Sequence, residues 1–281
     1  MIPKIIHYCW FGRGRLPRSA KKCIKSWKKF LPDYAIKVWN EDNFDVNCIQ
    51  YTKEAYAAKK YAFVSDYARF KILYEHGGLY FDTDVEVIRP LDKLLENGAF
   101  MGMEEDPVFL ENGGLSARRP EDAGMINPGL GLAVAPGLGL YKDILDMYAG
   151  LKFIRDDGTL DTTTVVRRVT DLLLGKGMIP SRGVIDFEGV KIYPSEYFCP
   201  MSWRTQKLVV TPNTYTIHWY TASWWDARHR TLHYISNHYG PRAAYYVGYF
   251  WRPFPVVVRS LIGAVKRRVL RVIGFKNALP S

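Results

Sequence analysis

The alternation of hydrophobic and polar residues predicts regular elements from the first residues onward. The apolar run KIIHYCWFG, residues 4–12, is typical of a buried strand that breaks at Gly12. Residues 19–32 predict a helix capped by Ser19, and residues 34–40 predict a second strand. A strand, a helix and a further strand in quick succession indicate an α/β fold with parallel strand pairing.

Residues 54–76 contain no glycine or proline and end at a Gly-Gly pair, so they predict a helix with a glycine stop. Asp66 and Arg69 lie three residues apart on its flank, an arrangement typical of an ordinary surface ion pair. Four aromatic residues recur at helical spacing and are expected in the core: Phe63, Tyr67, Phe70 and Tyr74.

The next segment, GGLYFDTDVEV at residues 77–87, predicts a strand that carries two aspartates one residue apart. Because strand residues two apart share a face, Asp82 and Asp84 are expected beside Tyr80 and Glu86, opposite an apolar face. Two carboxylates so close repel each other unless a proton, a basic group or a cation neutralises them. A metal site, an acid/base pair and a solvated sheet face are the three interpretations.

Two later runs predict further strands of the same sheet. Residues 99–106, AFMGMEED, end in acids, and residues 127–137, NPGLGLAVAPG, predict a buried strand of small residues between turns. Ligands of open α/β sheets gather at the carboxyl ends of strands, so the aspartate pair is well placed for chemistry.

The composition favours one large core. The chain has 281 residues, 48% of them hydrophobic and 15% aromatic, which excludes a disordered protein. Its four cysteines show no CxxC pair, and we expect reduced thiols in the cytoplasm. The N-terminus lacks the apolar stretch of a signal peptide, and no run of about 18 apolar residues predicts a membrane span.

The formal charge of +11 is concentrated near the C-terminus. Ten of the basic residues and no acidic residue follow Asp226, so residues 1–226 carry only +1. We expect two domains, 1–226 and 227–281, the second a basic, aromatic-rich, helical extension. An apolar arc from Val258 to Ile273 predicts an amphipathic helix on an anionic membrane and disfavours nucleic acid as the partner. The basic residues expected to face the lipid are Arg259, Lys266, Arg267 and Arg271.

Three motifs in order carry a family resemblance: IPKIIHYCWFG at residues 2–12, SDYARFKILYEHGGLYFDTDVEV at 65–87 and IHWYTASW at 217–224. Together they resemble the bacterial DxD-motif sugar transferases, which are similar to the glycosyltransferase 32 family and to the catalytic domains of the large clostridial glucosylating toxins. The resemblance covers roughly residues 1–225. It implies a GT-A-like, Rossmann-like fold for residues 1–226, with a mainly parallel central sheet flanked by helices.

The resemblance also implies roles for the charged residues. Asp84 would bind Mn²⁺ or Mg²⁺ directly, and Asp82 would contact the donor sugar or ribose, or the metal through water. Asp66 and Arg69 would hydrogen-bond the donor sugar, with Arg69 also near the leaving phosphate. Asp82, Asp84 and Arg69 are thus the expected catalytic residues.

The resemblance implies further donor contacts, with Trp10 stacking on the nucleotide base. The predicted strand register places Tyr80 on the side of the aspartates, where two interpretations stay open: it touches the sugar, or it covers the sheet edge. Ser223 and Trp224 would bind phosphate, although Trp225 fits as well as Trp224.

Three other positions keep weaker or open interpretations. Asn127 and Asp161 are weak candidates for the acceptor pocket, on position alone. His218 fits the site or a satisfied core histidine equally well.

The function that this resemblance implies is a retaining, metal-dependent transferase. A UDP-sugar would donate galactose, glucose or an N-acetylhexosamine to a lipid-linked saccharide, on the cytoplasmic face of a bacterial membrane, during capsule or other surface polysaccharide synthesis. Two alternatives remain: a non-catalytic membrane or nucleic-acid binding protein, and a glycoside hydrolase that uses the acidic pair.

Overall fold

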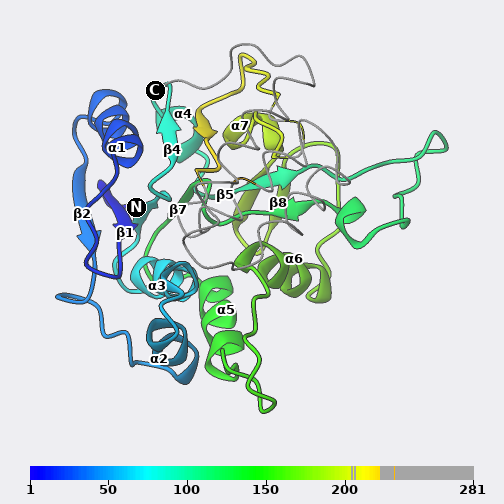
Figure 1. Cartoon of the computed structure of the whole chain (residues 1–281). Coiled ribbons are helices and arrows are strands. Elements are labelled where there is room, and N and C mark those ends of the chain that lie inside the picture. Colours follow the sequence, from blue (N-terminus) through cyan, green and yellow to red (C-terminus); the bar gives the residue numbers. More distant parts are fainter. Residues whose placement is uncertain (204, 206, 222–230, 232–281) are drawn as a thin grey trace, which may run out of the picture. The chain divides into compact units, whose positions relative to one another are not determined.

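The computed structural model of the chain describes residues 1–203, 205, 207–221 and 231. An eight-stranded sheet lies at the centre of the described residues (Figure 1). Its strands in spatial order are β2 (Ala35–Trp39), β1 (Ile5–Cys9), β3 (Gly78–Tyr80), β7 (Leu132–Val134), β5 (Ala99–Glu105), β9 (Val190–Tyr193) and β8 (Ile185–Phe187), with β6 (Met125–Ile126) paired to β5.

The sheet is parallel where the sequence predicted it and mixed elsewhere. Strand β1 pairs in parallel with both β2 and β3, and β5 pairs in parallel with β9. Strand β7 is antiparallel to both β3 and β5, and β8 is antiparallel to β9. The expected α/β class and the predicted opening strands are confirmed, with antiparallel pairings between the parallel ones.

Helices cover both faces of the sheet (Figure 1). One face carries α2 (Gln50–Ala57), α3 (Tyr61–His76), α5 (Gly139–Ala149) and α6 (Val165–Gly175). The other carries α1 (Arg18–Phe30), α4 (Asp92–Leu95), α7 (Ser195–Phe198) and a two-stranded sheet of β4 (Val85–Val87) and β10 (Thr216–His218). A short 3₁₀ helix, η1 (Pro120–Ala123), precedes β6.

Alternation along β3 shows why the sheet is buried on both sides. Tyr80 packs with Phe70 in one core cluster, whereas Leu79 and Phe81 pack with Trp27 in the other. Successive strand residues point to opposite faces, and helices cover both. Tyr80 is therefore buried rather than exposed, while its hydroxyl lies beside Asp82 as predicted.

The predicted strand at 77–87 is two strands separated by a turn, which corrects the shared-face argument for the aspartates. Strand β3 ends at Tyr80 and β4 begins at Val85. The Val85 N–H donates to the Asp82 carbonyl at 3.1 Å, closing a four-residue turn that contains both aspartates. The chain turns here because β4 leaves the central sheet and pairs with β10.

The predicted helix at 54–76 is also divided in two. Helix α2 ends at Ala57, Lys59 has a φ of 57°, and α3 begins at Tyr61. The Lys60 N–H donates to the Ala55 carbonyl at 2.8 Å, which satisfies the end of α2. The predicted core aromatics of α3 are confirmed, since Phe63, Tyr67 and Phe70 are buried and Tyr74 is partly buried.

Helix α1 begins one residue before the predicted cap. Its N-cap is Pro17, and Ser19 lies inside the first turn. None of the described helices is both long and apolar enough to cross a bilayer. The predicted domain boundary at residue 226 and the amphipathic segment lie outside the described residues.

Candidate active site

The turn that carries the aspartates lies where three segments of the chain meet. The Asp82 N–H donates to the Gly129 carbonyl at 3.0 Å, and the Trp219 N–H donates to the Asp84 carbonyl at 3.0 Å. The turn follows β3, whose carboxyl end lies beside that of parallel β1. This edge is the position at which open α/β sheets bind ligands.

Arg69 joins the helix before the turn to the turn itself. Its Nη2 lies 2.8 Å from Asp66 Oδ1 and 3.4 Å from Asp82 Oδ1. The Arg69 and Asp66 side chains are only 4% and 10% exposed, so the interpretation as a surface ion pair is wrong. Burial raises the pKa of Asp66 to about 7 even though Arg69 opposes the shift. One buried guanidinium thus holds two carboxylates in place.

Tyr80 fixes the orientation of Asp82. Its hydroxyl donates to Asp82 Oδ1 at 3.0 Å, and its ring centre lies 5.0 Å from the Arg69 guanidinium carbon. Tyr80 is 1% exposed, so in this structure it acts on Asp82 rather than presenting a surface to a ligand. Burial raises the pKa of Asp82, and Arg69 partly offsets that effect.

Asp84 is held by the last residue of β10, His218, and by Thr221, which follows that strand. His218 Nε2 lies 3.2 Å from Asp84 Oδ1, and Thr221 donates its N–H and its hydroxyl to Asp84 Oδ2 at 2.9 and 3.1 Å. Burial alone would raise the pKa of Asp84, but His218 and Thr221 lower it to about 2. Burial would lower the pKa of His218, and Asp84 instead raises it well above its ordinary value.

These contacts exclude a solvated sheet face. The side chains of Asp82 and Asp84 are 31% and 15% exposed, and each carboxylate has protein donors. Their pKa values are shifted in opposite directions by their surroundings, which is typical of functional carboxylates. The structure also assigns His218 to the site, where the sequence left two interpretations open.

The donor set around Asp84 fits a divalent cation. Asp84 remains ionised, and carboxylate oxygens suit Mg²⁺ and Mn²⁺. Asp84 raises the pKa of His218, so the imidazole could join such a site only in its neutral form. His218 Nδ1 is buried and has no hydrogen-bond partner among the described residues. In the described part of the chain, no three or more His, Cys, Asp or Glu side chains are grouped so that they could hold a metal ion by themselves. A cation here would take its remaining ligands from substrate and water.

Asn127 connects the turn to a second acidic residue. Its side chain donates to Glu104 Oε2 at 2.6 Å and accepts from the Gly129 N–H at 2.7 Å. A Cβ placed on Gly129 would lie 2.1 Å from Asp82 Oδ2, so only glycine fits beside the carboxylate. Burial raises the pKa of Glu104, one of the acids at the end of the predicted strand 99–106, which the sequence favours as part of a polar loop.

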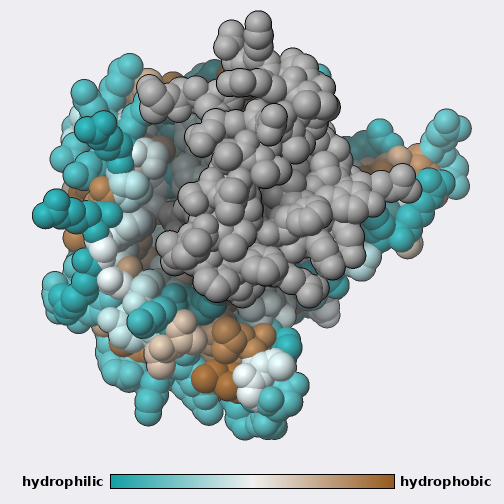
Figure 2. Space-filling view, viewed as in Figure 1, coloured by the Kyte–Doolittle hydropathy of each residue, from teal (hydrophilic) through white to brown (hydrophobic). Residues whose placement is uncertain are grey.

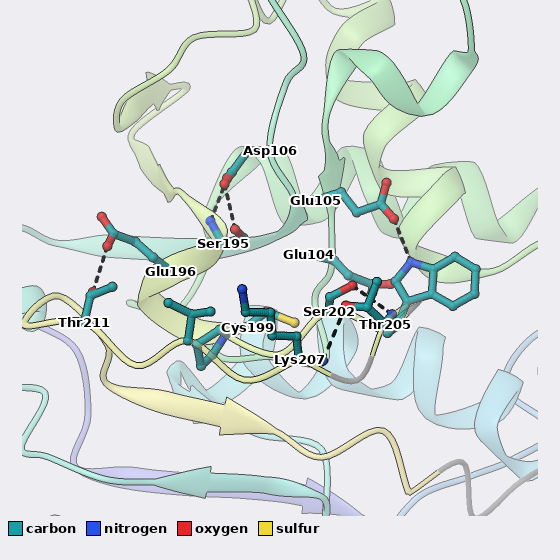
Figure 3. A pocket seen from close by; sticks show the side chains of 13 residues that line it. Glu104, Glu105, Asp106, Ser195, Glu196, Cys199, Ser202, Thr205, Lys207 and Thr211 are labelled. Atoms are coloured by element: carbon teal, nitrogen blue, oxygen red, sulfur yellow. Dashed lines mark hydrogen bonds between the residues drawn. The ribbon is translucent and has the colours of Figure 1, made fainter. Parts of the chain in front are cut away.

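A cavity of about 420 Å³ adjoins this group on the side of α7 (Figure 3). Glu104 and Cys199 line it, and Cys199 Sγ lies 2.9 Å from the hydroxyl of Tyr220. Trp203 contributes a flat wall, and its Nε1 donates to Glu105 at 2.6 Å. The lining combines apolar surface, including Pro200 and Val209, with four acidic side chains and several hydroxyls. The acids are Glu104, Glu105, Asp106 and Glu196, and the other polar residues are Ser195, Ser202, Thr205, Lys207 and Thr211 (Figure 3).

The other predicted residues lie in separate settings. Trp10 follows β1, is partly buried and donates from Nε1 to the Gly14 carbonyl at 2.6 Å. Asp161 pairs with Arg155 and Arg168, which indicates a structural role, and its place in the acceptor pocket stays a prediction. Ser223 and Trp224 lie outside the described residues.

Comparison with known proteins agrees with this geometry. Residues 17–101 match the family model Gly_transf_sug, described as a glycosyltransferase sugar-binding region containing a DXD motif. The chain is 32% identical over 108 residues to inositol phosphoceramide mannosyltransferase 3 of Schizosaccharomyces pombe, covering 36% of this chain and 29% of that protein. It is 33% identical over 106 residues to the uncharacterized glycosyltransferase L373 of Acanthamoeba polyphaga mimivirus, covering 36% and 42%.

The chain therefore spans less than half the length of these relatives. The solved structure titled PaToxG Glycosyltransferase is 18% identical, with 63% of this chain and 72% of that chain covered and a TM-score of 0.40. The family match contains Asp66, Arg69, Asp82 and Asp84, the charged residues that the structure brings together. Over residues 17–101, the chain is similar to the sugar-binding region of DXD-motif glycosyltransferases.

Proposed function

We propose that this protein is a metal-dependent glycosyltransferase that moves a hexose from a nucleotide-diphosphate sugar, foremost a UDP-sugar. The observation that carries the proposal is the coincidence of the DXD family match with the buried network of Asp66, Arg69 and Asp82 beside Asp84. A divalent cation, when bound, supplies positive charge to the departing diphosphate. The coordination positions of the cation that the protein does not fill would be taken by oxygens of the substrate.

The residues of the chain divide the remaining work. Asp84, with His218 beside it, would hold the cation, and Asp82 would face the donor sugar or ribose. Arg69 is a buried cation fixed beside Asp82, and it would face the leaving phosphate without reorganising as negative charge develops. Asp66 fixes the Arg69 guanidinium and can itself accept from a sugar hydroxyl.

The acceptor proposal rests on the cavity beside Glu104, which has both apolar and hydrogen-bonding walls. Its tryptophan wall and its many hydroxyl and carboxylate groups suit a saccharide, because sugars combine flat apolar faces with many hydrogen-bonding groups. The yeast relatives are named for transfer of mannose to inositol phosphoceramide, which supports a lipid-borne acceptor. We propose a lipid-linked saccharide used in surface polysaccharide synthesis, with the basic C-terminal region on the cytoplasmic face of a bacterial membrane.

We further propose that transfer retains the anomeric configuration by front-face displacement. In that mechanism the leaving phosphate takes the proton of the acceptor, so no protein nucleophile is needed. A double displacement would need one more indispensable carboxylate, and Glu104 is the buried candidate in the described site. Trapping a glycosyl group on Glu104 would exclude the front-face mechanism.

The test is a donor panel with purified full-length chain. UDP-glucose, UDP-galactose, two UDP-N-acetylhexosamines and GDP-mannose are each incubated with Mn²⁺ or EDTA, and release of the nucleotide is measured. GDP-mannose is included because the relatives are named mannosyltransferases. Metal-dependent release from one donor, abolished in Asp84→Asn, supports the proposal. Metal-independent cleavage of a simple glycoside would favour a hydrolase instead.

A further inference from the structure

Helix α1 presents an exposed face that carries only positive charge. The helix contains no acidic residue. Its six basic residues are all exposed: Arg18, Lys21, Lys22, Lys25, Lys28 and Lys29. None of the six forms an ion pair with another described residue, whereas the nearby Lys4 and Arg13 pair with Asp33 and Asp42. Over this stretch of about 16 Å, at 1.5 Å per residue, the basic face of α1 is therefore uncompensated.

The rest of the body has the opposite charge. Residues 1–226 carry a net +1, so the six cations of α1 leave −5 on the remaining residues of that part. Figure 2 shows mostly hydrophilic side chains over the region of α1. An anionic surface attracts the six cations of α1 and, in net charge, repels the remaining residues of this part of the chain.

The opposite face of α1 attaches it firmly to the active-site region. Ala20, Cys23 and Trp27 are buried. Trp27 Nε1 donates to the Val85 carbonyl at 2.8 Å, and the Val87 N–H donates to the Ser26 hydroxyl at 2.9 Å. Strand β4, which accepts the first bond and donates the second, begins directly after Asp84. A surface that binds α1 is therefore linked through β4 to the DxD turn.

We propose that the basic face of α1 is a docking surface for an anionic lipid bilayer. Five of its six cations are lysines, which act as point charges toward a diffuse layer of headgroups rather than as bidentate forks. The two aromatic rings of α1, Trp27 and Phe30, pack in the core, so the basic face offers no ring for stacking on nucleic-acid bases. This docking extends the membrane part of the proposed function to a described element, and it does not require catalysis.

The experiment is co-sedimentation of the full-length chain with phosphatidylcholine vesicles, with and without phosphatidylglycerol. The variant Lys21→Gln/Lys25→Gln/Lys28→Gln removes three charges from α1. The matched control, Lys53→Gln/Lys59→Gln/Lys60→Gln, removes three exposed charges elsewhere. The C-terminal region is unchanged in both variants, so its contribution is common to them. Circular dichroism and thermal unfolding confirm that each variant is folded.

We expect partitioning onto phosphatidylglycerol vesicles to fall by about tenfold or more in the α1 variant and by less than about twofold in the control. Salt should weaken binding of the unaltered chain in parallel. Equal losses in both variants, or no loss in the α1 variant, would overturn the proposal. So would an α1 variant that loses binding to oligothymidylate while keeping vesicle binding. Nucleotide affinity should be unchanged in both variants, which separates this test from that of the proposed function.

Discussion

His218 Nε2 lies 3.2 Å from Asp84 Oδ1, and the other ring nitrogen of His218 is buried without a hydrogen-bond partner among the described residues. Asp84 directly precedes β4, and His218 is the last residue of β10, the strand that pairs with β4. In this state the histidine neutralises the carboxylate that the family match places in the DXD motif. A cation at Asp84 would take over that neutralising role.

Replacing His218 tests whether it belongs to the cation site. We predict that His218→Asn weakens Mn²⁺-dependent binding of UDP by at least about 10- to 100-fold, because loss of a ligand or of its support lowers metal affinity by that order. Binding of UDP in EDTA should barely change. Calorimetric titration measures both, and an unaltered Mn²⁺ dependence would return His218 to the role of a core histidine.

Gly129 leaves the space that Asp82 occupies. In Gly129→Ala the new Cβ would lie 2.1 Å from Asp82 Oδ2, so the carboxylate must move. We predict at least a tenfold loss of donor turnover, because a displaced Asp82 carboxylate no longer holds the geometry that the reaction requires. The control is Gly139→Ala at the start of α5, where a Cβ meets nothing within 4 Å and activity should be unchanged. Equal activity of the two variants would contradict the assigned position of Asp82.

Arg168 forms a partly buried ion pair with Asp161, and its guanidinium lies over the buried rings of Tyr51 and Tyr148. Its Nη2 lies 2.6 Å from Asp161 Oδ2, with both side chains at most 14% exposed. We predict that Arg168→Met lowers the free energy of unfolding by about 3 kcal/mol, because Asp161 loses a buried partner. The neighbouring Arg167 pairs with Asp171 in solvent, and Arg167→Met should cost less than about 1 kcal/mol. Urea unfolding compares them, and similar costs would refute the structural role of the Arg168 pair.

His7 gives the fold a dependence on acid. Trp39 Nε1 donates to His7 Nδ1 at 3.0 Å, so Nε2 carries the proton and donates to the Gly77 carbonyl at 3.0 Å. Burial lowers the pKa of His7 from 6.5 to about 4. Between these values only the unfolded chain binds the extra proton, so stability is lost as pH falls from about 6.5 to about 4.

The loss attributable to His7 is at most about 3 kcal/mol. Urea unfolding at a series of pH values measures it, with His7→Gln as the comparison, since glutamine retains a donor and an acceptor. In that variant, the free energy of unfolding should fall less steeply as the pH is lowered from about 6.5 to about 4. An identical slope in both proteins would show that other groups cause it.

The sequence predicted those parts of the fold that depend on local pattern. Apolar runs identified β1, β2 and β5, and helical spacing identified the core residues of α3. The break at Lys59 was not predictable, because a positive φ at a lysine leaves no compositional signal. The turn at the aspartates was missed for a similar reason: β4 has strand composition but pairs with β10, more than a hundred residues later.

The candidate site was predictable in identity and less so in arrangement. The motif singled out Asp66, Arg69, Asp82 and Asp84, but the sharing of Arg69 between Asp66 and Asp82 depends on the packing of α3 against β3. Glu104 and Gly129 were missed because they reach the site only through the order of strands in the sheet. An HW pair just before the Ser-x-Trp element was the one local signal for His218.

The central claim is that the DxD turn binds a cation together with a nucleotide diphosphate. Calorimetric titration of the full-length chain with UDP, in Mn²⁺ and in EDTA, tests it most directly when repeated on Asp84→Asn. We predict binding that requires Mn²⁺ and disappears in the variant. If GDP binds in place of UDP, the enzyme class stands and the donor changes. If neither nucleotide binds in a folded protein, the claim is contradicted.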